Sequence, residues 1–252
     1  MQRPVQKGFC GTGGIVLSRV AAHNWEEPCI SGTRGSGTVF FAGCNLKCRF
    51  CQNFDISVST HGKEVSAERL ADVFLYVQET GVANINLVTP SHVADGVAKA
   101  LTLAKPFLKI PVVYNTSSYE KVSSLKMLEG LVDVYMPDLK FCDPDVSRLL
   151  CGAGDYFRVA TSAITEMRRQ CPDDIFDGEG YMQKGLLLRH LVLPSFTEDS
   201  KKVLDWVADF DKTPMSALWR STSPHERTTR CLNSTAVCTV TSTTMCCNTF
   251  ST

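Results

Sequence analysis

The sequence predicts an α/β fold built on a mostly parallel β-sheet. Three observations predict it. Short apolar runs alternate with segments of helical periodicity, the runs are apolar almost throughout, and a length of 252 residues suits one domain of α/β-barrel size. Strands separated by helices imply right-handed crossovers between parallel strands. A doubly wound sheet, part of a β/α barrel and a pair of small domains all remain compatible with this pattern.

Five apolar runs predict the strands. The first follows a glycine-rich turn and is rich in β-branched and aromatic residues. The five runs are Thr38–Ala42, Asn84–Thr89, Pro111–Asn115, Val132–Met136 and Gly185–Leu193. Because they lack a regular polar face, we expect both faces of the sheet to be covered.

The segments between these runs predict the helices. In the first of them Leu70, Phe74 and Val77 recur at helical spacing, Ser66 is a typical N-cap, and Gly81 ends the segment. The predicted helices are Ser66–Thr80, Val93–Ala104, Tyr119–Leu128, Asp145–Leu150, Tyr156–Gln170 and Lys201–Phe210.

Each predicted strand is followed by polar residues, and the carboxyl ends of parallel strands are where functional groups gather. These segments are Gly43–Cys51, Thr89–His92, Asn115–Ser118, Pro137–Lys140 and Pro194–Ser195. Turns are polar in most proteins, which is sufficient to explain Ser117 and Ser118. Two charges beside a buried strand, on Asp138 and Lys140, are less easily explained that way and indicate a site.

The composition narrows the function classes. The formal net charge is zero, which argues against nucleic acid or an anionic membrane as the main partner. Apolar residues make up 44% of the chain, enough for a buried core, yet no stretch is long enough to span a bilayer. The first residues are polar and do not resemble a signal peptide. We therefore expect an intracellular, cytoplasmic protein.

Twelve cysteines are many for a chain in a reducing compartment, where clustered thiols suggest metal or redox chemistry. Four lie near the end of the chain, and five are scattered, at Cys10, Cys29, Cys142, Cys151 and Cys171. Ordinary core packing is the simplest interpretation of the last three of these. The remaining three, Cys44, Cys48 and Cys51, form a C-x3-C-x2-C motif directly after the first predicted strand.

Thiolates in this pattern select iron–sulfur clusters, zinc or copper(I). A structural zinc site and a ferredoxin cluster each require four ligands, and no second CxxC pair lies near. Three thiolates on a [4Fe–4S] cube would leave one iron open for catalysis. The alternatives are a non-catalytic zinc or iron–sulfur binding protein, with a fourth ligand from His61, Cys10 or Cys29, and an ordinary barrel enzyme with incidental cysteines.

With Phe50 as its aromatic residue, the cysteine motif resembles the signature of the radical S-adenosylmethionine (radical SAM) superfamily. The segments Glu26–Gly32, Gly35–Phe41 and Cys51–Asn53 resemble an uncharacterised branch related to pyruvate formate-lyase activating enzyme. Similar segments of the activating-enzyme group match Asn115–Thr116, Asp138–Lys140 and Arg189–Pro194. The likeness extends roughly from Gly8 to Phe210.

The resemblance implies a partial (β/α)6 TIM-like barrel, and an iron–sulfur enzyme in which the catalytic residues Cys44, Cys48 and Cys51 hold a [4Fe–4S] cluster. S-adenosylmethionine would chelate the fourth iron and be cleaved to a 5′-deoxyadenosyl radical that abstracts hydrogen from a substrate. The implied partners are a flavodoxin- or ferredoxin-like one-electron reductant and an unknown protein or small molecule, with a glycyl radical enzyme as one option. Nucleic acid and membrane are not expected.

The resemblance also implies contacts to S-adenosylmethionine. Phe50 would contact the adenine, and Asn115 and Thr116 would bind the ribose or the carboxylate. The segment Thr89–His92 stands where many relatives carry a Gly-Gly-Glu element that holds the methionyl amine. This sequence lacks that element, so Ser91 Oγ or backbone carbonyls are expected to replace it.

Charged residues of the last two predicted strands complete the implied site. Asp138 would accept from the amine or ribose, and Lys140 would face the carboxylate. Arg189 and His190 are neighbours in one strand and must point to opposite faces, so only one of them faces the interior.

Three segments describe the expected organisation: an N-terminal extension (1–34), the partial barrel (35–212) and an atypical tail (213–252). From Pro214 onward 16 of 39 residues are Ser or Thr. A sixth strand is expected there, but the composition change suggests a disordered tail or a shifted reading frame. The barrel is therefore predicted to be incomplete at its C-terminal end. Relatives also carry a cysteine-rich stretch near the N-terminus, of which Cys10 could be a remnant, although an auxiliary metal site at Cys10 and Cys29 is not favoured.

Overall fold

The computed structural model describes residues 8–210, 215–220, 238–241 and 244–245. Its sheet contains parallel strands, which are β2 (Ser36–Phe41), β4 (Ile85–Val88), β5 (Val112–Thr116), β6 (Val134–Pro137), β8 (Met182–Val192) and β9 (Met215–Arg220). The antiparallel strands are β1 (Ile15–His23), β3 (Lys63–Val65), β7 (Ile175–Phe176), β10 (Cys238–Thr241) and β11 (Thr244–Met245).

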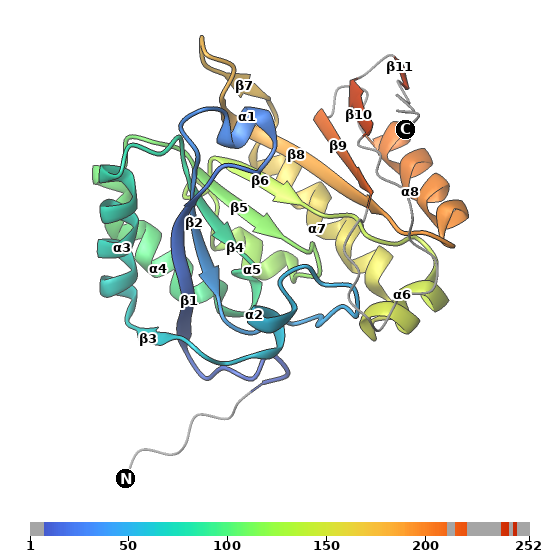
Figure 1. The fold of residues 1–252 in the computed structure, drawn as a ribbon, viewed down its shortest axis with the longest axis horizontal. Helices are drawn as coiled ribbons and strands as arrows, with labels where there is room; N and C mark the ends of the chain where they lie inside the picture. The colour runs from blue at the N-terminus through green and yellow to red at the C-terminus, as the bar shows by residue number, and fades with distance from the viewer. Residues whose placement is uncertain (1–7, 211–214, 221–237, 242–243, 246–252) are drawn as a thin grey trace, which may run out of the picture.

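The strand order is β11-β10-β9-β8-β6-β5-β4-β2-β1-β3, and β7 pairs with β8 (Figure 1). All neighbours from β2 to β9 run parallel, whereas β1 lies antiparallel to β2 and β3 lies antiparallel to β1. The described sheet does not close, because β2 pairs with β1 on its outer side and not with β9. This is the α/β architecture with a partial parallel barrel that the sequence and the resemblance predict.

The helices connect the strands. The longer ones are α3 (Ala67–Glu79), α4 (Ala94–Ala104), α6 (Pro144–Cys151), α7 (Tyr156–Gln170) and α8 (Thr197–Phe210). The short ones are α1 (Pro28–Ser31), α2 (Phe54–Val58), α5 (Val122–Lys126) and the 3-10 turns η1 (Ser91–Val93) and η2 (Lys105–Phe107). The bounds of α7 are the predicted ones, and Ser66 caps α3 by accepting from the Arg69 N–H at 3.2 Å.

One predicted helix is shorter than expected. The segment Tyr119–Leu128 becomes helical only at Val122. The preceding turn holds Ser118 at a φ of 65°, and the backbone N–H of Glu120 bonds to the Ser118 carbonyl at 2.9 Å. The residues of this turn therefore form the connection that follows β5, and the helix begins only after them.

Two buried clusters hold the fold together. The larger one packs the helices against the outer face of the sheet, for example Phe74 of α3 and Leu101 of α4, both fully buried. The smaller one lies on the other face, where Ile30 of α1 packs against Val113 of β5 and Val134 of β6. Since α1 places Ile30 against the inner face of the strands, the N-terminal extension forms part of the barrel core.

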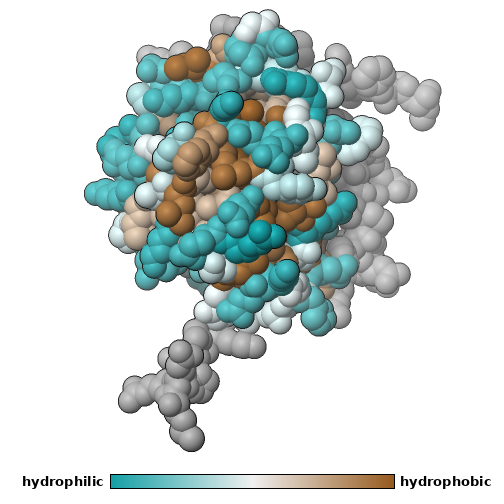
Figure 2. All heavy atoms as spheres, turned by 90° about the vertical axis from the view of Figure 1, so that its left-hand side faces the viewer, coloured by the Kyte–Doolittle hydropathy of each residue, from teal (hydrophilic) through white to brown (hydrophobic). Residues whose placement is uncertain are grey.

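Figure 2 shows the side of the molecule that carries α3. Separate hydrophobic areas are bordered there by hydrophilic residues. The apolar stripe of α3, with Leu70, Phe74 and Val77, is buried against the sheet, whereas Tyr76 of the same helix is exposed. Among the described residues no helix is long and apolar enough to cross a membrane.

A sixth parallel strand follows α8, at the position where the composition of the tail made a strand doubtful. The backbone of Met215–Arg220 forms β9, which pairs in parallel register with Leu187–Val192 of β8. The expectation that the parallel strands stop before Pro214 is thus corrected. The segment contains the short apolar run Ala217–Trp219, but the Ser/Thr content of the whole tail obscured this signal. Most of the remaining tail lies outside the described residues, so its predicted disorder or frame shift stays a prediction.

Candidate metal and cofactor site

A cavity of about 350 Å³ lies where the parallel strands end. Its wall comes from three parts of the chain. The loop after β2 contributes Cys44, Cys48, Phe50 and Cys51. The ends of β5, β6 and β8 contribute Asn115, Thr116, Asp138, Lys140 and Arg189. The segment between β1 and α1 contributes His23, Trp25 and Glu26. Residues from opposite ends of the sequence therefore face one space.

The loop after β2 presents all three cysteines of the motif to this cavity. Cys44 and Cys48 are buried, Cys51 is half-buried, and none of the three is in a disulfide. Backbone hydrogen bonds fix the loop at both ends, from Gly43 N to the Ile56 carbonyl at 2.9 Å and from Arg49 N to the Leu150 carbonyl at 2.9 Å. The thiols are held in place by the backbone and not by each other.

The donor type of these residues suits an iron–sulfur cluster, since a [4Fe–4S] cube is bound by cysteine thiolates. His61, a proposed fourth zinc ligand, is exposed on the surface. Cys44, Cys48 and Cys51 thus fit the predicted group in donor type, and all three line the same cavity.

Backbone strain is concentrated beyond the carboxyl ends of the parallel strands, and Thr89, one of the strained residues, lines the cavity. The described non-glycine residues with positive φ are Lys47, Thr89, Ser118 and Ser195, at 54°, 58°, 65° and 69°. Each follows the carboxyl end of a parallel strand, namely β2, β4, β5 and β8. A non-glycine residue in this conformation costs about 1–2 kcal/mol. Strain that persists at one rim of a fold is typical of functional loops.

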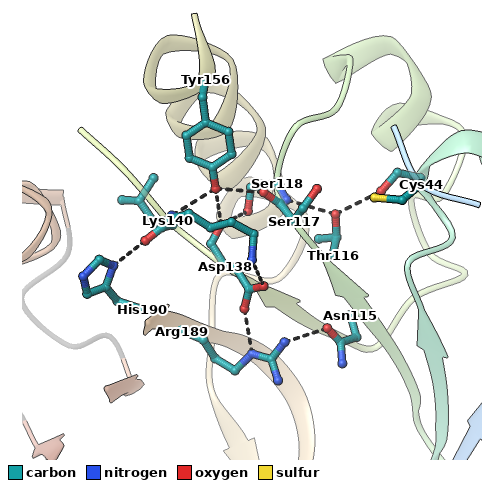
Figure 3. A network of polar contacts seen from close by, with 12 residues as sticks. Cys44, Asn115, Thr116, Ser117, Ser118, Asp138, Lys140, Tyr156, Arg189 and His190 are labelled. Atoms are coloured by element: carbon teal, nitrogen blue, oxygen red, sulfur yellow. Dashed lines mark hydrogen bonds and ion pairs between the residues drawn. The ribbon is translucent and has the colours of Figure 1, made fainter. Parts of the chain in front are cut away.

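A buried network of charges forms the wall beyond β6 and β8 (Figure 3). Arg189 Nε donates to Asp138 Oδ1 at 2.9 Å, and its Nη2 donates to Asn115 Oδ1 at 2.7 Å. Its Nη1 lies 3.3 Å from Glu26 Oε2 and 3.5 Å from Glu27 Oε1. One guanidinium therefore faces three carboxylates.

A second cation completes this network. Lys140 Nζ donates to Asp138 Oδ2 at 2.6 Å, so the two oxygens of Asp138 bind two different cations. Burial alone raises the pKa of Asp138, but Arg189 and Lys140 outweigh it and hold that pKa below its usual value. Glu26 behaves differently, because burial raises its pKa to about 7 despite the nearby Arg189.

A buried carboxylate organises the hydroxyl groups at the ends of β4 and β5. Glu120 accepts hydrogen bonds from Ser91 Oγ at 2.8 Å, from Tyr114 OH at 2.9 Å and from Thr116 Oγ1. Burial raises the pKa of Glu120, and these three donors partly offset the rise. Since the carboxylate accepts, the Ser91 and Thr116 hydroxyls direct their protons to it. Thr116 Oγ1 also accepts from the Ser118 N–H at 3.1 Å, which leaves it one lone pair for a further donor.

The structure settles which of two neighbouring residues faces the cavity interior. The Arg189 side chain points into the charge network, whereas His190 Nδ1 lies 2.6 Å from the Leu139 carbonyl (Figure 3). Since a carbonyl only accepts, Nδ1 carries the proton. Arg189 is the inward residue of the pair.

Most predicted site residues come together. Phe50, Asn115, Thr116, Asp138, Lys140, Arg189 and the three cysteines all line the cavity. Ser91 is one hydrogen bond away, since its Oγ lies 3.1 Å from Thr116 Oγ1. Cys29 packs instead against the core inside the barrel, and Cys10 lies beside Gly43, so these two thiols do not form one site.

Sequence reasoning missed Glu120 and did not assign roles to Trp25 and Glu26. Glu120 lies in a segment whose periodicity suggests a helix, and nothing in it signals a buried carboxylate. Trp25 and Glu26 lie in an extension without a clear pattern. Their only signal is the Glu-Glu-Pro-Cys sequence that begins at Glu26 and belongs to the segment Glu26–Gly32 that carries the resemblance.

Comparison with known sequences gives one family and one curated relative. The sequence model of the Radical SAM superfamily matches residues 38–207. The uncharacterized protein MJ0674 of Methanocaldococcus jannaschii is 28% identical over 218 residues, which are 82% of this chain and 59% of that protein. The chain thus spans about 59% of the length of this relative.

Solved structures support the same fold. Methylornithine synthase (PylB) superposes with a TM-score of 0.52 at 14% identity, over 73% of this chain and 52% of that one. Streptococcus suis SuiB bound to S-adenosylmethionine gives a TM-score of 0.50 at 16% identity, over 72% of this chain and 39% of that one. At such identities the likeness concerns the fold alone.

Proposed function

The chain belongs to the radical SAM superfamily, and on that basis we propose that it holds a [4Fe–4S] cluster through Cys44, Cys48 and Cys51 and uses it to cleave S-adenosylmethionine reductively. The observation that carries this proposal is the shared cavity, in which three thiols face a buried network of charged and hydroxyl groups. When bound, the cluster would supply the electron that breaks the sulfonium C–S bond and yields the 5′-deoxyadenosyl radical.

The charge network would orient the methionyl end of S-adenosylmethionine. Lys140 would face the carboxylate, because its ammonium already lies at the cavity wall and stays charged beside Asp138. Asp138 remains ionised and would accept from the amine or the ribose. Arg189 would act through Asp138 and Asn115, whose side chains it fixes by direct hydrogen bonds.

The hydroxyl groups around Glu120 would receive the methionyl amine in place of the missing Gly-Gly-Glu element. An ammonium needs acceptors. The Ser91 and Thr116 hydroxyls direct their protons to Glu120, and Thr116 Oγ1 keeps one lone pair beside the Ser118 N–H that it accepts. The negative charge of Glu120, when ionised, lies one hydroxyl group behind them and adds to the attraction.

Phe50 would contact the adenine. Its ring lines the cavity and packs edge-on against Phe141, with 5.7 Å between the ring centroids at 87°. Phe141 in turn contacts Tyr156 at 5.7 Å. These edge-to-face contacts hold the Phe50 ring in one orientation, so that it presents a fixed apolar surface to a base.

The substrate end of the cavity would lie at the segment before α1. Trp25 is 82% exposed at the cavity wall, which suits contact with an incoming partner. We propose, in keeping with the resemblance to the branch related to pyruvate formate-lyase activating enzyme, that the substrate is another protein and that the product is a glycyl radical. A small molecule is the alternative substrate, and a flavodoxin- or ferredoxin-like protein would supply the electron.

Anaerobic reconstitution with iron and sulfide tests the proposed chemistry. The protein is expected to show a [4Fe–4S] spectrum and, after reduction with dithionite, to convert S-adenosylmethionine to 5′-deoxyadenosine and methionine. Cys48→Ala should lose both properties, whereas Cys171→Ala, which removes a buried thiol that bonds to the Asp133 carbonyl, should keep them. Stoichiometric zinc without 5′-deoxyadenosine would instead identify a binding protein.

A second experiment addresses the substrate class. The reduced, reconstituted protein is incubated with S-adenosylmethionine and a candidate glycyl radical protein, and the sample is frozen for electron paramagnetic resonance. A glycyl radical signal supports an activase. Formation of 5′-deoxyadenosine without any protein radical contradicts this part of the proposal and leaves the cleavage chemistry intact.

A further inference from the structure

The charged groups around the end of β6 and β8 do not balance. Three carboxyl groups, on Glu26, Glu27 and Asp138, surround two cations, Arg189 and Lys140. The exposed fraction of each of these side chains is 23% or less. With every group ionised, this set would carry one negative charge in excess, and an uncompensated charge away from water is costly. A proton on one carboxyl group removes the excess.

The contacts indicate which carboxyl group takes this proton. Both oxygens of Asp138 bind cations, at 2.9 Å from Arg189 Nε and 2.6 Å from Lys140 Nζ. Glu26 and Glu27 instead share a single atom, Arg189 Nη1, at 3.3 and 3.5 Å. Of these two glutamates, Glu26 is the one that lines the cavity. The pKa of Glu26, which burial raises to about 7, agrees with a proton on this group below neutral pH.

A positive charge that enters the cavity would change this balance. S-adenosylmethionine carries a sulfonium, a fixed positive charge that cannot be lost as a proton. Such a charge beside the carboxyl groups compensates their excess and favours the ionised form of the protonated one. S-adenosylhomocysteine has a neutral thioether at the same sulfur and lacks only the methyl group, so it does not supply this charge.

We propose that Glu26 holds a proton in the free protein and releases it to solvent when the sulfonium of S-adenosylmethionine binds. This inference rests on the proposed function, and it makes Glu26 a residue that favours the charged cofactor over its neutral thioether analogue. A proton released on binding makes the affinity rise with pH, for as long as the free protein still holds that proton.

Isothermal titration calorimetry in two buffers of different ionisation enthalpy counts the released protons. With the reconstituted, oxidised full chain at about pH 6, S-adenosylmethionine should release about one proton more than S-adenosylhomocysteine, because Glu26 is then largely protonated. The amine of both ligands is also protonated at this pH, so a proton lost there cancels in the comparison. Equal release with the two ligands overturns the proposal, and this result needs no variant.

Glu26→Gln keeps the size of the side chain and has no proton to release, so the extra proton should disappear. Two imidazoles belong to the cavity wall, and such groups ordinarily titrate near neutral pH. The His190 ring bonds to the Leu139 carbonyl, which leaves His23 of β1 as the group to exclude. His23→Gln is the matched control and should keep the extra proton, whatever its affinity. An extra proton that persists in Glu26→Gln contradicts the assignment.

The proton can also be observed without any ligand. A protonated carboxyl group has a carbonyl stretching band in the infrared, which an ionised carboxylate lacks. The difference spectrum between the metal-free chain and its Glu26→Gln variant at about pH 6 should contain this band, separated from other buried carboxyl groups such as Glu120. Glu198→Gln, at an exposed pair with Lys201, should not remove it.

Absence of the band from the difference spectrum contradicts a protonated Glu26. A chain that shows the band but binds neither ligand would disprove the proposed function and leave the protonated glutamate standing. A chain that binds S-adenosylmethionine without the extra proton would disprove this inference alone.

Discussion

Two walls of the cavity differ in what holds them. The thiol wall (Cys44, Cys48, Phe50 and Cys51) is fixed by neutral hydrogen bonds and ring contacts, and its sulfurs carry no ion pair in the structure. The ion-pair wall (Asn115, Asp138, Lys140 and Arg189) is fixed by charges that bind one another. The sulfurs of the thiol wall are therefore available to bind a ligand, whereas the side chains of the ion-pair wall are already held by one another before any ligand binds. Substitutions should therefore affect stability at one wall and ligand binding at the other.

The largest loss of stability is expected at the centre of the ion-pair wall. Arg189→Leu leaves Asp138, Glu26 and Glu27 without their shared cation, so the free energy of unfolding should fall by about 3–5 kcal/mol. Urea unfolding of the metal-free protein measures it. The control is Arg69→Leu, which removes an exposed pair with Asp72 and should cost less than about 1 kcal/mol. Equal losses in the two variants would contradict a structural role for the network.

The same wall should make stability depend on pH. Glu26 has a pKa of about 7 in the folded chain, above the ordinary value of 4.5, because burial outweighs the attraction of Arg189. Between these two values the folded state holds a proton that the unfolded state has lost. Stability should therefore fall as pH rises from about 4.5 to 7, by up to about 3 kcal/mol.

Urea unfolding at several pH values measures this dependence. Glu26→Gln removes the titrating group and should abolish the fall, although Arg189, Glu27 and Asp138 remain around it. A curve for the glutamine variant that is parallel to that of the unmodified protein would assign the dependence to another group.

A smaller effect is expected where hydroxyl groups meet Glu120. In Glu120→Gln the amide nitrogen replaces one accepting oxygen. Either the bond from Tyr114 or the two bonds from Ser91 and Thr116 are then lost, and about 1–3 kcal/mol of stability with them. The affinity for S-adenosylmethionine should fall as well, which equilibrium dialysis measures. Tyr114→Phe removes a donor that does not face the cavity and should weaken stability without this loss of affinity. Unchanged affinity in the glutamine variant would separate Glu120 from the methionyl amine.

The smallest effect on stability is expected at the thiol wall. Cys44→Ser keeps the size and polarity of the side chain, so unfolding of the metal-free protein should change by less than about 1 kcal/mol. Iron content after reconstitution should nevertheless drop sharply, because a hydroxyl group is a poor ligand for iron in a cluster. A loss of stability like that of Arg189→Leu would mean that both walls are structural.

The comparison also explains what the sequence could and could not predict. The strands of the barrel and the cysteine loop follow from local patterns, since period, turn residues and C-x3-C-x2-C spacing lie within short segments. Asp138 and Lys140 were found because two charges beside a buried strand are unusual. Arg189 binds both Asp138 and Glu26, and since Glu26 and Arg189 lie 163 residues apart, no local pattern can pair them.

Other features of the structure could not be predicted from the sequence for related reasons. Strand β1 belongs to an extension in which only Ile15–Leu17 is clearly strand-like, and β9 was hidden by the composition of the tail. The candidate site thus brings together residues of ordinary types that lie far apart in the sequence.

The antiparallel strand β1 prevents the parallel strands from closing into a complete barrel. It takes the outer hydrogen-bonding edge of β2, through pairs such as Val20 with Val39, and that edge is the one that a closed barrel would join to its last strand. Closure would require β1 to be peeled away. The described barrel is therefore kept open by the order of its strands, and closing it would cost the hydrogen bonds between β1 and β2.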